Sequence, residues 1–193
     1  KNVVDAFHKD IMMIIPYVNG EPLMYKGIYQ AIEYTTNKKV LSLIASNGIL
    51  LNERNSTKLV EAGLDFLKVH ISGFTNPIHQ IQHRKGDVEL ILKNLENFVK
   101  IKKSYNSNII VMLDYILYEH NKHELVQFRE FTNKLGFDLN IRPGNNRGME
   151  DTEKTYDEVD AMNIPCEWLW KVMTVNWNGD LLPCCEYVTW SNA

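Results

Sequence analysis

The sequence predicts an α/β domain made of repeated strand and helix units around a parallel sheet. Five short apolar runs have the length of buried strands, at residues 10–16, 40–45, 66–71, 109–117 and 138–142. Helical stretches separate them, and this alternation is typical of a parallel sheet. Periodicity alone allows either an open doubly wound sheet or a barrel, because right-handed crossovers build both.

The helices between these strands carry their own signals. From Val88 to Val99 apolar residues recur at helical spacing with lysines on other faces, which predicts a helix that covers the sheet. A second amphipathic helix is predicted over residues 122–135, with Gly136 as its C-terminal stop. Ser56 is the predicted N-cap of a helix over residues 57–61, and residues 2–8 are interpreted as the end of another helix.

Composition argues against several classes of protein. The 193 residues carry a formal net charge of -3, with both signs mixed along the chain. This pattern lacks the excess of basic residues that binds nucleic acid or an anionic membrane. No apolar run approaches the roughly 20 residues that cross a bilayer. The N-terminus lacks the succession typical of a secretory signal. We therefore expect no nucleic-acid or membrane partner, and a cytoplasmic location.

The pattern of strands and helices ends after residue 142. A loop at residues 143–148 and an acidic stretch at 150–160 predict a boundary between a domain at 1–148 and a linker with a small extension at 149–193. The extension contains a predicted hairpin turn at Asn178, Gly179 and Asp180. It also holds the cysteines of the chain, which favour metal ligation or free thiols over a disulfide framework: Cys166, Cys184 and Cys185.

Polar residues follow the first three strands at the points where ligands bind in parallel α/β proteins. Glu21 comes after the first strand, Asn47 ends the second, and Ser72 ends the third, each beside a glycine. Any one of these segments is also an ordinary turn. Three consecutive strands that end in this way favour a ligand site.

This ordered series resembles the radical S-adenosylmethionine superfamily over about residues 10–142. Gly20, Glu21 and Pro22 are similar to its Gly-Gly-Glu-Pro motif, which holds the amino group of the methionine moiety. Asn47 lies in a segment similar to the Thr-Asn-Gly of the third barrel strand, and Ser72 in a fourth-strand segment near the ribose. The resemblance implies strands two to six of a partial (β/α)6 TIM-like barrel.

The cysteine-containing segment resembles the start of a SPASM or twitch extension. The resemblance implies that Cys166, Cys184 and Cys185 are ligands of an auxiliary [4Fe-4S] cluster, since soft thiolates suit such clusters. The alternative is a buried structural thiol with an incidental cysteine pair.

The sequence departs from the family pattern in two places. Asn19 stands where the motif usually has its first glycine. The Cys-x3-Cys-x2-Cys loop that binds the radical-forming cluster does not occur before Gly20. The resemblance therefore implies a fragment whose cluster loop lies upstream of residue 1, and whose remaining extension cysteines lie beyond residue 193.

The resemblance implies an enzyme in which a reduced [4Fe-4S] cluster cleaves S-adenosylmethionine to a 5'-deoxyadenosyl radical. That radical would abstract hydrogen from a substrate, for which a peptide or protein is the first expectation and a small molecule the alternative. A reductant such as flavodoxin or ferredoxin is implied, and no catalytic residue is assigned. Two other classes remain open, a cluster-less binding or scaffold module and a zinc-stabilised binding protein.

Other polar residues receive simpler interpretations. His120, His123 and Glu124 are interpreted as solvated residues at a helix start rather than as a metal site. His79 and His83 are expected in a polar loop or helix, with substrate contact as the alternative. Arg142 at the end of the last strand is expected to face the cofactor or to form a structural ion pair, with equal weight.

Overall fold

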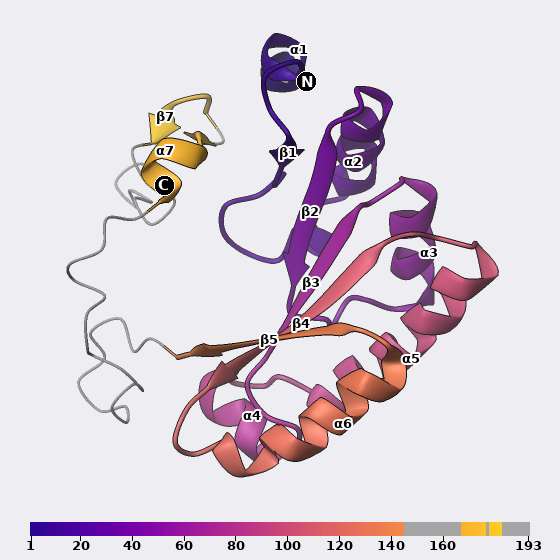
Figure 1. The fold of residues 1–193 in the computed structure, drawn as a ribbon, viewed down its shortest axis with the longest axis vertical. Coiled ribbons are helices and arrows are strands. Elements are labelled where there is room, and N and C mark those ends of the chain that lie inside the picture. The colour runs from indigo at the N-terminus through magenta and orange to yellow at the C-terminus, as the bar shows by residue number, and fades with distance from the viewer. Residues whose placement is uncertain (145–166, 177, 183–193) are drawn as a thin grey trace. The chain divides into compact units, whose positions relative to one another are not determined.

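The fold consists of two compact units (Figure 1). The computed structural model describes residues 1–144, 167–176 and 178–182. The first unit contains the sheet domain, and the second contains a short helix and a hairpin near the C-terminus. Among the described residues, no helix has both the length and the apolar character to cross a membrane.

The first unit is built on a five-stranded sheet in the order β1-β2-β3-β4-β5, with every neighbouring pair parallel. This confirms the predicted α/β class and the partial barrel. The strands are β1 (Met13–Ile14), β2 (Leu41–Ser46), β3 (Phe66–Ile71), β4 (Ile110–Leu117) and β5 (Asp138–Pro143). Strand β1 is much shorter than predicted, because only its two residues pair with β2.

The helices that pack on the sheet lie on one of its faces (Figure 1). These are α2 (Ile28–Asn37), α3 (Glu53–Glu61), α5 (Val88–Ser104) and α6 (Leu125–Leu135), while α4 (Asn76–Gln82) follows β3 and α1 (Asn2–Phe7) precedes the sheet. Strand β3 shows the two faces clearly. Leu67, Val69 and Ile71 are buried toward the helices, whereas Lys68 and His70 alternate with them on the opposite face and are partly exposed.

One predicted helix cap is wrong and another is confirmed. Helix α3 begins at Glu53, and Asn52 is its N-cap, accepting a 3.0 Å hydrogen bond from Asn55 N. Ser56 lies inside the helix, buried, with its hydroxyl donating to Leu51 O. The Asn52 amide oxygen caps as well as a serine hydroxyl, so the helix starts one turn earlier. Gly136 ends α6 in the left-handed conformation, with φ of 69°, as predicted.

The second unit contains α7 (Trp168–Lys171) and an antiparallel hairpin of β6 (Thr174–Val175) with β7 (Leu181–Leu182). Gly179 adopts φ of +94° in the connection, and Asp180 N donates to Asn178 Oδ1 at 3.1 Å. The predicted hairpin turn is therefore confirmed. Cys166, Cys184, Cys185 and the predicted boundary after residue 148 lie outside the described residues.

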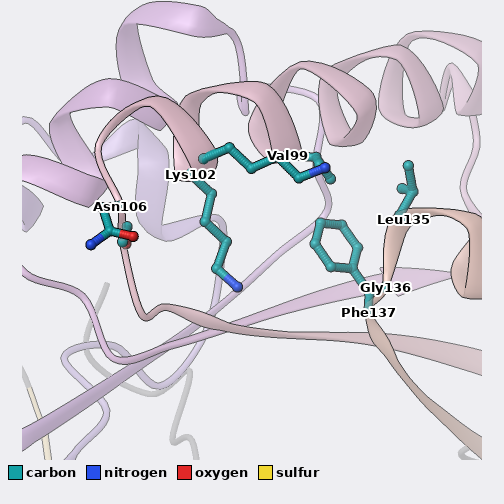
Figure 2. Close-up of a pocket in the computed structure, with 8 residues that line it drawn as sticks. Val99, Lys102, Asn106, Leu135, Gly136 and Phe137 are labelled. Carbon is teal, nitrogen blue, oxygen red and sulfur yellow. The ribbon is translucent and has the colours of Figure 1, made fainter.

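A hollow of about 340 Å³ lies at the amino-terminal edge of the sheet (Figure 2). Val99 and Lys102 line it from α5, Asn106 from the turn after that helix, and Gly136 and Phe137 from the segment before β5. Parallel α/β proteins bind ligands at the opposite edge, where the strands end. This hollow is therefore not the candidate site.

Candidate functional site

The parallel order of the sheet places the polar residues predicted from strands β1 to β3 at one edge. Asn47 and Ser72 directly follow the carboxyl ends of β2 and β3. Glu21 lies in the loop after β1 and reaches the end of β2 through direct hydrogen bonds. The structure thus brings Glu21 and Asn47 together, as the spacing of the motifs predicted.

Glu21, Ser46 and Asn47 form what we name the Glu21 cluster. Glu21 Oε1 accepts hydrogen bonds from Ser46 Oγ at 2.8 Å and Leu23 N at 3.2 Å. Glu21 Oε2 accepts from Asn47 N at 2.8 Å. A carboxylate has about four acceptor positions, so three bonds fix its orientation and leave one for a ligand. Ser46 is buried, whereas Glu21 remains partly exposed.

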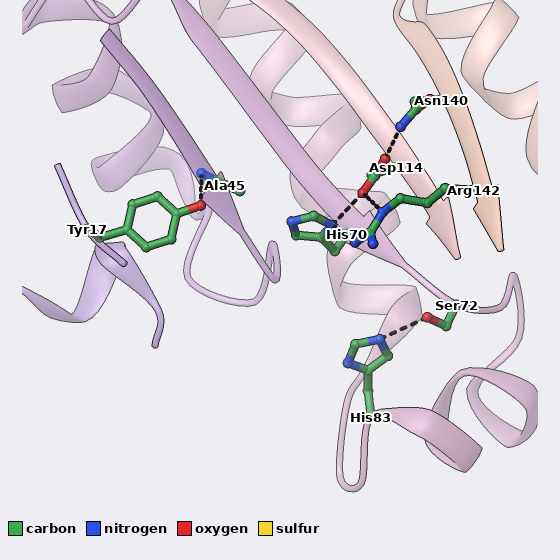
Figure 3. Close-up of polar contacts among 8 residues, drawn as sticks. All are labelled: Tyr17, Ala45, His70, Ser72, His83, Asp114, Asn140 and Arg142. Carbon is green, nitrogen blue, oxygen red and sulfur yellow. Dashed lines mark hydrogen bonds and ion pairs between the residues drawn. The ribbon is translucent and has the colours of Figure 1, made fainter. Parts of the chain in front are cut away.

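The residues beside Glu21 hold the loop in shape. Gly20 has φ of +86°, a left-handed conformation that a side chain disfavours. Pro22 begins a short 3₁₀ helix, Pro22–Met24, for which Glu21 is the N-cap. Tyr17, which sequence reasoning did not single out, accepts a 3.0 Å bond from Ala45 N (Figure 3). Burial and the Glu21 charge raise the pKa of Tyr17 despite this bond, which keeps its hydroxyl protonated.

Ser72 is fully buried, and its polar contacts are with residues outside the Glu21 cluster. Its Oγ is 3.0 Å from His83 Nε2 (Figure 3), and its carbonyl accepts from Asn121 Nδ2 at 3.0 Å. Ser72 N donates to His79 Nδ1 at 3.4 Å. Of residues 70–73, it is His70 that is partly exposed, on the face of the sheet opposite the helices.

His79 and His83 stack with ring centroids 4.5 Å apart. Burial, with a smaller effect of His83, lowers the pKa of His79 to about 4, although Glu124 acts in the opposite direction. Burial also lowers the pKa of His83, with His70 contributing. The first expectation, a polar helix or loop, is met only in part. His79 is in α4 but 2% exposed, so it is a packed group rather than a solvated one.

Another polar network lies on the face opposite the helices, where β3, β4 and β5 place His70, Asp114 and Asn140 side by side in register. We name these three residues and Arg142 the Asp114 cluster (Figure 3). Asp114 Oδ2 accepts from Arg142 Nε at 2.6 Å and lies 2.8 Å from His70 Nδ1. Asn140 Nδ2 donates to Asp114 Oδ1. Of the two expectations for Arg142, the ion pair is present.

The charge of Asp114 follows from this network. Its side chain is fully buried, which raises the pKa of a carboxyl. Hydrogen bonds from His70, Arg142 and Asn140, together with the Arg142 charge, outweigh burial and hold the pKa of Asp114 well below its usual range. Sequence reasoning missed Asp114 and Asn140. The available signal was a single carboxylate inside a strand that is otherwise apolar.

Glu124 corrects one interpretation from the sequence. It is 5% exposed rather than solvated, and its carboxylate accepts bonds from Phe74 N at 2.5 Å and from Thr75 Oγ1 at 2.5 Å. A second bond to Oε2 comes from Thr75 N at 3.2 Å. Glu124 therefore fixes the loop that connects β3 to α4, and with it the segment after Ser72.

The sequence predicted metal ligands only among the cysteines, and the cysteines are not among the described residues. Within residues 1–144, 167–176 and 178–182, no three His, Cys, Asp or Glu side chains are grouped so that they could hold a metal ion. The prediction for Cys166, Cys184 and Cys185 therefore stays a prediction.

Known proteins share this sequence pattern. The model of the radical SAM superfamily matches residues 2–131. The AdoMet-dependent heme synthase of Oleidesulfovibrio alaskensis is 24% identical over 119 residues, which cover 61% of this chain and 31% of that protein. The Fe-coproporphyrin III synthase of Methanosarcina barkeri is 29% identical over 84 residues, 44% of this chain and 21% of that protein. The chain thus spans a third or less of these two relatives.

Solved structures share the fold. Streptococcus suis SuiB superposes with a TM-score of 0.59 at 13% identity, over 75% of this chain and 32% of that one. Archaeal TYW1 gives a TM-score of 0.52 at 16% identity, over 74% and 49% of the two chains. Since the family model covers more than half of the sequence, this chain belongs to the radical SAM superfamily.

Proposed function

We propose that this chain supplies the S-adenosylmethionine-binding part of a radical SAM enzyme, with Glu21 as the group that holds the amine of the cofactor. The Glu21 cluster is the observation that carries the proposal. Its carboxylate is oriented by Ser46 and Asn47 and retains acceptor capacity at the edge of the sheet where ligands bind. An ammonium group is the complementary ligand for such a carboxylate.

With Gly20, Glu21 and Asn47 holding S-adenosylmethionine, the cofactor would supply radical-based hydrogen abstraction from a substrate once a reduced [4Fe-4S] cluster is also bound. The residues of this chain bind and orient. Gly20 brings the backbone into the loop conformation that presents Glu21, and Asn47 fixes that carboxylate through its backbone N–H. Ser72 acts from a buried position, since its hydrogen bonds to His83 and Asn121 hold the end of β3 in place.

We further infer that Cys166, Cys184 and Cys185 bind an auxiliary [4Fe-4S] cluster in a SPASM or twitch extension. Support comes from the thiol spacing around a glycine-containing hairpin, of which β6, β7 and Gly179 are described. A peptide or protein is the proposed substrate, a small molecule is the alternative, and flavodoxin or ferredoxin is the proposed reductant.

The experiment uses protein purified without oxygen and extended by whatever chain naturally precedes Lys1 and follows Ala193. After reconstitution with iron and sulfide, we expect a brown chromophore, bound iron and release of 5'-deoxyadenosine from S-adenosylmethionine. The absence of both chromophore and cofactor cleavage would contradict the enzyme and favour a cluster-less binding module.

The assigned site is tested by Glu21→Gln, which keeps the shape of the side chain and removes its charge. Hydrogen bonds to charged groups contribute about 1.5–3 kcal/mol, so we expect the Kd for S-adenosylmethionine to rise roughly ten- to a hundredfold. Glu89→Gln, an exposed position on α5, is the matched control and should leave the Kd unchanged. Equal Kd values for the two variants would remove Glu21 from the site.

A further inference from the structure

We propose that His70 is a proton acceptor for an O–H or N–H group of the ligand, held in the required tautomer by Asp114. The inference extends the proposed function, since it assigns chemistry to the face of the sheet on which the ligand would lie. Asp114 acts here as a positioning residue, and the ring nitrogen that meets the ligand is His70 Nε2.

The hydrogen on His70 Nδ1 follows from the charge of Asp114. The carboxylate is fully buried and accepts hydrogen bonds from Arg142 Nε, at 2.6 Å, and from Asn140 Nδ2. Both of these nitrogen atoms can only donate. The carboxylate therefore acts as an acceptor toward all its neighbours. The third neighbour, His70 Nδ1 at 2.8 Å, must then carry a hydrogen.

The tautomer of the ring determines which nitrogen can accept a proton. A neutral imidazole with hydrogen on Nδ1 has a lone pair on Nε2. Figure 3 shows the second ring nitrogen of His70 directed away from Asp114. Arg142 Nη2 lies 3.5 Å from Nδ1, at the outer limit for a hydrogen bond, and does not compete for Nε2.

The His70 ring is accessible to a ligand. The His70 side chain is 29% exposed, whereas His79 and the Asp114 carboxylate are covered. Of the described residues, the titratable and charged groups that interact with the ring are Asp114 on β4, Arg142 on β5 and His83 after α4. Lys68 lies two residues earlier on the same face of β3. Among the described residues no hydrogen bond to His70 Nε2 is formed, so this lone pair is available to a ligand.

The proposed step is a proton transfer without a change in oxidation state. The O–H or N–H bond of the ligand breaks heterolytically, the proton moves to His70 Nε2, and the electron pair remains on the ligand oxygen or nitrogen. The positive ring then lies against the Asp114 carboxylate, whose buried negative charge stabilises it. The donor is a hydroxyl of S-adenosylmethionine or a hydroxyl or amine of the substrate.

The tautomer is measured by long-range ¹H–¹⁵N NMR of the histidine rings in the cofactor-free protein. We expect hydrogen on His70 Nδ1 and none on Nε2. Asp114→Asn should abolish this preference, whereas Arg142→Leu should keep it, because the contact between Asp114 and His70 remains. A wild-type ring with hydrogen on Nε2 overturns the proposal, and this result does not require Asp114→Asn to fold.

Reaction with diethyl pyrocarbonate, mapped by mass spectrometry, measures the free lone pair. His70 should react at least tenfold faster than buried His79, at a rate comparable to exposed His123. An unreactive His70 beside a reactive His123 overturns the proposal. In the reconstituted protein, protection by S-adenosylmethionine assigns the donor to the cofactor, and persistent reactivity assigns it to the substrate. Failure to bind S-adenosylmethionine would contradict the proposed function alone, because the tautomer and the free reactivity are measured without it.

Discussion

Acidification should destabilise the fold through His79. The ring is 2% exposed, its Nδ1 accepts a hydrogen bond from Ser72 N, and it stacks on His83. Burial lowers its pKa in the folded protein to about 4, against 6.5 for an exposed imidazole. Between these two values the unfolded chain binds the proton and the folded chain does not. The stability that neutral His79 contributes is therefore complete above about pH 6.5 and is lost as the pH falls toward 4.

The magnitude follows from the size of the pKa difference. Each pKa unit corresponds to about 1.4 kcal/mol, so the full shift sets an upper limit of about 3 kcal/mol. Between pH 7 and pH 4.5 the expected loss in the free energy of unfolding is about 2 kcal/mol from this one ring.

Urea denaturation at pH 7 and pH 4.5 measures this loss. His79→Asn places an amide oxygen near the position of Nδ1 and removes the titrating ring, so its stability should fall by about 2 kcal/mol less than that of the wild type over the same pH interval. His123→Asn, at an exposed position, should behave like the wild type. The carboxylates and His83 are present in all three proteins, so the difference between His79→Asn and the wild type reports the loss of the His79 ring, including its effect on the stacked His83. If His79→Asn loses as much stability as the wild type, His79 does not resist protonation in the folded chain.

Three other substitutions test the loop beside Glu21, the loop after β3 and the predicted cysteine ligands. Gly20→Val puts a branched side chain at φ of +86° and should weaken S-adenosylmethionine binding measured by calorimetry. The control Gly136→Ala, also at positive φ, should lower only the melting temperature. Unchanged affinity in Gly20→Val would argue against the assigned loop. Glu124→Gln weakens the hydrogen bonds from Phe74 and Thr75 and should lower the free energy of unfolding, measured by urea denaturation, by about 1.5–3 kcal/mol. A decrease no larger than that of the exposed control Glu130→Gln would contradict the role of Glu124. Replacing Cys184 and Cys185 together by alanine should lower the iron content, measured colorimetrically, by about one cluster per chain, because four ligands per cluster are usual. An unchanged iron content would exclude both cysteines as ligands.

Local sequence patterns determined the elements that depend on neighbouring residues. The periodicity from Val88 onward predicted helix α5, and the apolar run at residues 66–71 predicted β3 with its observed bounds. The glycine after α6 predicted its end. These signals succeed because helix spacing, strand alternation and left-handed caps are properties of a few consecutive residues. The order of the motifs also predicted that Glu21 and Asn47 meet, since the carboxyl ends of parallel strands share one edge.

Only the tertiary structure decided which polar groups become partners. Asp114 lies beside His70 and Asn140 because of the register between β3, β4 and β5, and register is set by packing across strands rather than by either strand alone. The same packing turned Ser72 toward His83 and left His70 on the other face, and it buried Glu124 beneath the loop after β3. Sequence alone therefore predicted which edge of the sheet holds the candidate site, and long-range packing decided which polar side chains lie together there.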